Sequence, residues 1–156
     1  MNGWKISEDH TREDRVCILA EYLEQWVKET DDLCTKAQVM DDLGVTSKEL
    51  GRIRVWASKN APERLIDATG GTYRICQTNG QLEDRLMHGI YTLQGTTNDY
   101  LRFIEAFENR FGKISEFAEA MKSGLILQMW GLKKLMDDLH EMNYQFPDES
   151  EVDDDE

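Results

Sequence analysis

Three threonines in the first third of the chain carry the pattern that begins a helix. Thr11, Thr35 and Thr46 are each followed, three residues later, by an acidic or amide side chain. At such a helix start the threonine hydroxyl accepts a hydrogen bond from the N–H three residues on, and that residue's side chain accepts one from the cap. The starts at Thr35 and Thr46 lie so close together that they predict two short helices joined by a tight turn.

Apolar residues recur at helical spacing behind each of these caps and set the expected extents. The first helix is expected over residues 12–29. The second ends at Leu43, before a glycine that adopts a left-handed helix end easily. The third is expected over residues 47–59, because Pro62 prevents continuation. Its buried face is predicted to consist of Leu50, Ile53, Trp56 and Ala57.

Gly70-Gly71 lies between two runs rich in Ile, Tyr and Thr within residues 63–77, which predicts a β-hairpin with a two-residue turn. This turn fixes four cross-strand pairs: Thr69 with Thr72, Ala68 with Tyr73, Asp67 with Arg74, and Ile66 with Ile75. Opposite charges then face each other, and so do two isoleucines, which favours this register.

Residues 36–56 resemble the helix-turn-helix family. Gly44 occupies the turn glycine, and Leu50 and Ile53 take the apolar positions that hold the second helix on the first. Met40 departs from the family, which most often has alanine there. Together with the hairpin as a wing, residues 12–77 look like the winged-helix fold. The resemblance implies a mostly α protein whose third helix enters the major groove of double-stranded DNA.

A basic stripe lies on that third helix. Lys48, Arg52, Val55 and Lys59 are spaced by four, three and four residues, so they share its outward side. The resemblance implies that the cations there reach phosphates or guanine edges, and that Val55 touches a thymine methyl. The predicted DNA-binding residues are Ser47, Lys48, Arg52, Arg54, Val55, Lys59, Arg64 and Arg74. Two alternatives stay open: a solvated face that binds nothing, and a Val55 that packs inward.

The charge of the chain is uneven. Its formal net charge is −13, but residues 1–76 carry 11 Lys/Arg and 14 Asp/Glu, a net charge of −3. Residues 77–156 carry 7 Lys/Arg and 17 Asp/Glu, a net charge of −10. A polyanion responds to the local charge distribution, so the acidic total does not argue against nucleic-acid binding.

The second half predicts a helical module. Residues 78–80 are expected to be a linker, residues 81–94 a helix, residues 95–99 a break, and residues 99–111 a second helix ended by Gly112.

A heptad seam follows, in which apolar residues alternate steps of four and three from Ile114 to Met142. Either the shorter helix before it folds back on this seam, or copies of the chain associate into a homodimer or larger homo-oligomer. Self-association is favoured, because the shorter helix is less than half as long as the seam. The predicted oligomerisation residues are Ile114, Met121, Leu125, Gln128, Leu132, Leu135 and Leu139.

These features predict a winged-helix domain at residues 1–79, a coiled-coil-like oligomerisation region at 80–146, and a disordered acidic tail at 147–156. No apolar run approaches the ~20 residues of a membrane span, and no secretory signal is visible. The expected location is the cytoplasm: at the nucleoid for a bacterial source, or in the host cytoplasm for a viral one.

Catalysis, metals and cofactors are not expected. No phosphate loop, GxSxG or HExxH motif occurs, and the three cysteines are widely spaced from one another and from the three histidines. The sequence therefore predicts a DNA-binding protein that self-associates, acting as a regulator or as a DNA-packaging or replication accessory factor. The alternative is a protein-protein adaptor or inhibitor that uses the same fold and whose acidic half mimics DNA or binds a basic partner.

Overall fold

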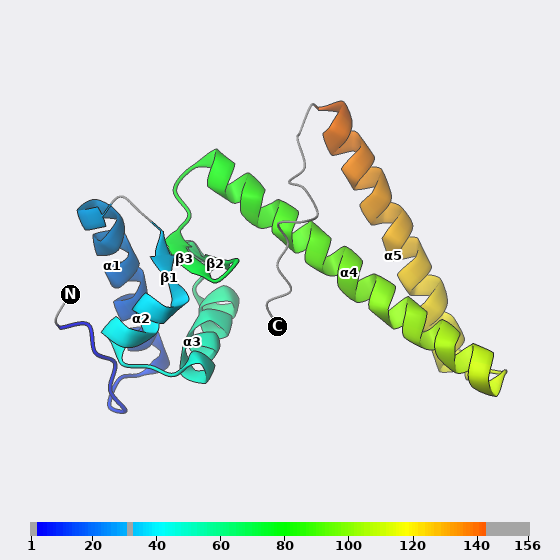
Figure 1. Cartoon of the computed structure of the whole chain (residues 1–156), viewed down its shortest axis with the longest axis horizontal. Helices are drawn as coiled ribbons and strands as arrows, with labels where there is room; N and C mark the ends of the chain where they lie inside the picture. The colour runs from blue at the N-terminus through cyan, green and yellow to red at the C-terminus, as the bar shows by residue number, and fades with distance from the viewer. Residues whose placement is uncertain (1–2, 31–32, 143–156) are drawn as a thin grey trace. The chain divides into compact units, whose positions relative to one another are not determined.

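The structure is a computed structural model that describes residues 3–30 and 33–142. It is mostly α-helical, with a small three-stranded antiparallel sheet and two long helices after it (Figure 1). The mostly α class is therefore confirmed. The chain divides between Arg85 and Leu86 into two compact parts, unit 1 and unit 2. The predicted acidic tail lies outside the described residues.

Unit 1 is built from short elements. They are α1 (Arg12–Thr30), β1 (Cys34–Thr35), α2 (Lys36–Leu43), α3 (Ser47–Asn60), a 3-10 turn η1 (Pro62–Arg64), β2 (Ile66–Thr69), β3 (Thr72–Ile75) and the first turns of α4 (Asn79–Phe111). All three predicted caps are confirmed: the hydroxyls of Thr11, Thr35 and Thr46 accept backbone N–H bonds at 3.1, 3.2 and 3.2 Å.

The three short helices and the sheet share one hydrophobic core. α3 contributes Leu50, Ile53 and Ala57, which are buried as predicted, while Trp56 is half-buried at its edge. The largest wholly covered side chain is Tyr22 of α1. Because one face of α3 is fixed in this core, its opposite face is held toward solvent.

The hairpin has the predicted register, with all four cross-strand pairs confirmed. Gly70 and Gly71 have φ of 61° and 72°, a left-handed conformation that glycine adopts without strain. The third strand, β1, was not predicted. It pairs with β3 through Cys34 and Tyr73 and gives the strand order β1-β3-β2.

A buried carboxylate joins the hairpin to the start of α4. Asp67, only 1% exposed, accepts hydrogen bonds from Thr69 Oγ1 at 2.7 Å, Arg85 Nη1 at 2.9 Å and Arg74 Nε at 3.0 Å. Burial raises the pKa of Asp67, but these three donors more than offset it and hold that pKa below its usual range. The ionised form is therefore the one that the fold stabilises.

Helix α4 corrects the predicted linker and break. Helix α4 already begins at Asn79, because the Thr78 hydroxyl accepts the N–H of Gln81 at 3.2 Å, and it runs unbroken through residues 95–99 to Phe111. Helix α5 (Glu116–Glu141) then returns along α4 (Figure 1), and Lys122 Nζ lies 2.7 Å from Glu108 Oε2. Within the described residues, no helix is long and apolar enough to cross a membrane.

We predict that Asp67→Asn lowers the free energy of unfolding at pH 7 by about 1–3 kcal/mol, because hydrogen bonds to a charged group are lost in a buried site. The folded-state pKa of Asp67 lies below the unfolded value of about 3.9. Its contribution is therefore complete above the unfolded pKa and disappears as pH falls through the folded pKa. Urea denaturation from pH 7 to pH 2 should show the two proteins converging at low pH.

Asp84→Asn is the matched control. Asp84 is exposed and lies 3.9 Å from the same Arg74, so its replacement should change stability by less than about 0.5 kcal/mol. Equal effects of the two substitutions would contradict the role given to burial of Asp67.

Candidate nucleic-acid interface

The predicted basic stripe lies on the outward face of α3. Lys48, Arg52 and Lys59 are exposed. Val55 between them is 45% exposed, so it does not pack inward. Ser47 is also exposed and occupies the first turn. The stripe thus presents three cations and one small apolar side chain on the face opposite the core.

The acid in the first turn of α3 belongs to the cap. Glu49 Oε2 accepts the N–H of Thr46 at 2.7 Å and its hydroxyl at 2.9 Å. These bonds to Thr46, with smaller effects of Arg15 and Arg52, hold the pKa of Glu49 below its usual range. The carboxylate therefore stays ionised, and its charge is directed toward the cap and partly neutralised by the nearby arginines.

A hollow of about 940 Å³ lies over this face of α3. Its lining includes Arg12 and Arg15 of α1 beside the cations of α3. Six cations and one acid line it, which gives a local formal charge of +5 in a chain of −13. Anion binding is the chemistry that such a surface favours.

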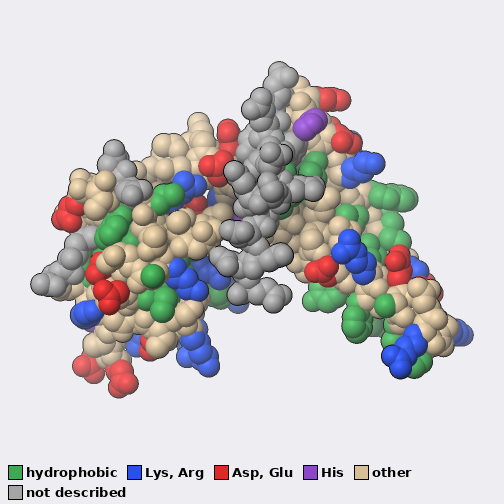
Figure 2. Space-filling model, viewed as in Figure 1, with side chains coloured by type: hydrophobic (Ala, Val, Ile, Leu, Met, Phe, Trp, Pro, Cys, Tyr) green, Lys and Arg blue, Asp and Glu red, His purple; other side chains and the backbone are tan. Residues whose placement is uncertain are grey.

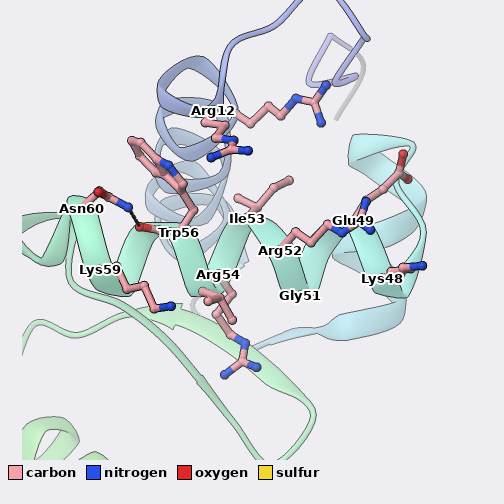
Figure 3. A pocket seen from close by; sticks show the side chains of 12 residues that line it. Arg12, Lys48, Glu49, Gly51, Arg52, Ile53, Arg54, Trp56, Lys59 and Asn60 are labelled. Carbon is pink, nitrogen blue, oxygen red and sulfur yellow. Dashed lines mark hydrogen bonds between the residues drawn. The ribbon is translucent and has the colours of Figure 1, made fainter.

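The cations border α3 on two sides. Figure 3 shows Arg54 and Lys59 on one side of the helix and Arg12 on the other. Arg54 lies close enough to the buried Tyr73 of β3 to counter part of the increase that burial gives to the pKa of that phenol. The stripe is thus flanked by charge on both edges rather than standing alone.

Sequence reasoning missed Arg12 and Arg15. Arg15 is anchored, since its Nε donates to the carbonyl of His10 at 3.1 Å and its Nη2 to that of Ser7 at 3.4 Å. Arg12 is exposed. Their three-residue spacing in the first turn of a helix was the available signal. What the sequence could not give was the packing of α1 against α3, which brings both arginines into the lining of the same hollow as the cations of α3.

Two of the predicted DNA-binding residues have partners inside unit 1. Arg64 donates from Nη2 to Cys17 Sγ at 2.7 Å. Arg74 is paired with Asp67, and its side chain is only 18% exposed. Their DNA contacts stay predictions. Neither side chain lines the hollow on α1 and α3.

The predicted oligomerisation residues are only partly covered in one chain. Ile114 is buried, Leu125, Leu132 and Leu139 are half-buried, and Met121, Gln128 and Leu135 are exposed. No described residue of α5 is fully buried. The more covered side also carries Lys122, which pairs with α4, as well as Met129 and Met136. The seam therefore does not face α4 squarely. Its edge with Leu125, Leu132 and Leu139 lies toward α4, and its edge with Met121, Gln128 and Leu135 is exposed.

Comparison with protein-family models, with curated proteins and with solved structures finds no match to this chain. Across residues 3–30 and 33–142, no group of three or more His, Cys, Asp or Glu side chains is arranged to hold a metal ion. The basic surface on α1 and α3 and the exposed apolar residues of unit 2 are therefore the features that bear on function.

We predict that Thr46→Ala lowers the free energy of unfolding by about 1 kcal/mol, because the N–H of Glu49 loses its acceptor and the capping box is broken. Thermal denaturation followed by circular dichroism measures this loss. Ser58→Ala, at an exposed position on the same helix, should stay within about 0.5 kcal/mol of the original protein. Equal stability of all three proteins would show that the cap does not hold the first turn of α3.

Proposed function

We propose that this chain is a DNA-binding protein of the winged-helix kind, in which α3 lies in the major groove and unit 2 joins copies of the chain. The observation that carries the proposal is the cluster of six cations from α1 and α3 around one open hollow. Three helices followed by a hairpin, the order expected of a winged helix, support the choice of α3 as the groove helix.

The dimensions of α3 suit this role. Its 14 residues extend roughly 21 Å at 1.5 Å per residue, and the major groove of B-DNA, ~12 Å wide, admits an α-helix. Arg52 and Lys59 reach phosphates or guanine edges from the outward face, and Val55 offers an apolar contact for a thymine methyl. Arg12 and Arg54, on the two edges, are placed for backbone phosphates.

The acidity of the chain does not prevent this binding. Exposed charges separated by more than ~8 Å are largely screened at physiological ionic strength. The phosphates therefore respond mainly to the cluster on α1 and α3, where the formal charge is +5. The acidic residues elsewhere in the chain lower its affinity for DNA of any sequence. Contacts to base edges therefore account for a larger share of the affinity for a specific site.

Self-association is the second part of the proposal. Large apolar side chains are exposed on both helices of unit 2, among them Phe103 at 75% and Trp130 at 68%. Exposed apolar groups of this size and number are typical of interaction surfaces. A protein with two or more copies of α3 binds paired half-sites, as helix-turn-helix dimers do.

We predict that the double substitution Arg52→Ala/Lys59→Ala weakens duplex binding at least about tenfold, because two charge-assisted contacts are lost. The slope of log K against log salt should fall by roughly two, since each phosphate contact contributes about 0.9. An electrophoretic shift series at several salt concentrations, with a random duplex library, measures both quantities.

Lys28→Ala/Lys133→Ala is the matched control. It removes the same charge from exposed positions outside the hollow and should leave the slope unchanged. If the original protein binds no duplex at low salt but captures a basic protein, and does so equally in the Arg52→Ala/Lys59→Ala variant, the adaptor or inhibitor function replaces the DNA-binding one.

We predict a different result for Arg12→Ala. A contact to the backbone carries no sequence information, so affinity should fall by a similar factor for every duplex, and the salt slope should fall by about one. Quantitative shifts with a preferred and a scrambled duplex test this. A loss confined to the preferred duplex would place Arg12 at a base edge instead.

A further inference from the structure

A second exposed apolar line runs along α4, and it continues through residues 95–99, where the sequence predicted a break between two helices. We define the α4 stripe as Leu86, Leu93, Tyr100 and Phe107, spaced seven residues apart, with Gly89, Thr96 and Phe103 between them. The four seven-spaced side chains are between 46% and 61% exposed, so α5 does not cover them. Figure 2 shows green hydrophobic side chains on the visible face of unit 2.

The spacing identifies the kind of partner. A seven-residue apolar repeat on one unbroken helix is the pattern of a coiled coil, in which a second helix winds along the first. The repeat spans 22 residues of the 33-residue helix α4, so the partner must be a long helix with a matching apolar line. A second copy of α4 meets both conditions, and a two-fold related pair uses the same stripe on each chain.

The sizes of the side chains favour an antiparallel pair. The first half of the stripe alternates Leu86 and Leu93 with the small residues Gly89 and Thr96. The second half is aromatic, with Tyr100, Phe103 and Phe107. In an antiparallel pair centred near Asn98, Gly89 of one copy lies opposite Phe107 of the other, and Thr96 opposite Tyr100. In these two layers a large residue meets a small one, which is how helical layers interdigitate, and between them Leu93 lies opposite Phe103. No atom lies within 4 Å of a Cβ built on Gly89, so the space is free.

A parallel pair has the opposite effect. Gly89 would face its own copy and leave a void, while Phe107 would face Phe107 and crowd it. The charges near the two ends of α4 also favour the antiparallel pair. An antiparallel pair brings Arg110, near the end of α4, close to Glu83 at its start, whereas a parallel pair brings each of these residues next to its own copy.

One like-charge contact opposes the antiparallel pair, because Asp99 then lies beside its own copy near the two-fold axis. Arg102, 3.9 Å from Asp99 in the same chain, offsets this repulsion.

We infer that the α4 stripe is a homodimer interface, formed by two copies of this chain that pair α4 antiparallel. The inference deepens the self-association part of the proposed function and depends on it, but it is independent of DNA binding. It also moves the main contact from the seam on α5, as predicted from the sequence, to α4.

The first test is the mass of the full chain in solution by size exclusion with light scattering. The original protein should have twice the 18.1 kDa of one chain, and Leu93→Asp should reduce the mass to that of one chain. Leu127→Asp makes the same change at an exposed position on α5 and should remain dimeric. Circular dichroism confirms that both variants keep their helices.

The outcomes separate the two proposals. A monomeric original protein overturns the inference together with self-association, and leaves the DNA-binding proposal to its own test. A dimer that survives Leu93→Asp but is lost in Leu135→Asp, on the exposed edge of the α5 seam, overturns the inference alone. A protein that is monomeric by itself and acquires mass only with another macromolecule overturns the inference and self-association together, as any monomeric result does.

The second test addresses the antiparallel orientation. Gly89→Phe should raise the dimer dissociation constant about tenfold, because Phe107 of the partner loses its space. Phe107→Ala should also weaken the dimer, by leaving a void. The double variant Gly89→Phe/Phe107→Ala exchanges large for small and should return close to the original value in sedimentation equilibrium. A double variant no tighter than the weaker single one overturns the antiparallel pairing.

Discussion

The buried carboxylate of Asp67 is the interaction on which the arrangement of unit 1 around its hairpin depends. A carboxylate removed from water is strongly unfavourable unless donors replace the lost solvation. Here Arg74 comes from the facing strand and Arg85 from the start of α4, so one charge fixes both the hairpin and the helix that follows it. As a consequence for function, Arg74, the arginine of the hairpin, is paired with Asp67 inside unit 1. The cationic surface therefore belongs to α3 and α1 rather than to the hairpin.

Much of unit 1 could be predicted because its signals are local. A capping threonine and the N–H that donates to it lie three residues apart, and a two-residue glycine turn fixes every cross-strand pair of the hairpin. Strand β1 lacks such a signal. Its two residues have no periodicity, and they become a strand only because Cys34 meets Tyr73, far along the chain. The approach of Arg12 to α3 has the same origin, since it depends on the packing of α1.

Unit 2 shows how propensity and periodicity can disagree. The run Gly95-Thr-Thr-Asn-Asp99 contains poor helix formers, and a glycine alone costs about 1 kcal/mol in a helix. These propensities predict a break. The seven-residue spacing from Leu86 to Phe107 passes through this run without interruption, and the structure follows the spacing. Thr78 and Gln81 also repeat the capping pattern of Thr35 and Gln38, so the start of α4 was visible in the sequence and overlooked.

The two proposed surfaces strengthen each other when copies pair. One unit 1 offers a single local charge of +5 within a molecule of net charge −13, which suits modest, salt-sensitive binding. An isologous pair through α4 carries two such surfaces related by a two-fold axis, and DNA sites recognised in this way are themselves palindromic. The second contact becomes intramolecular once the first has formed, so affinity rises at paired half-sites without new residues. In the proposed dimer, selectivity therefore follows from the pairing of two basic surfaces by symmetry rather than from a larger basic patch on each chain.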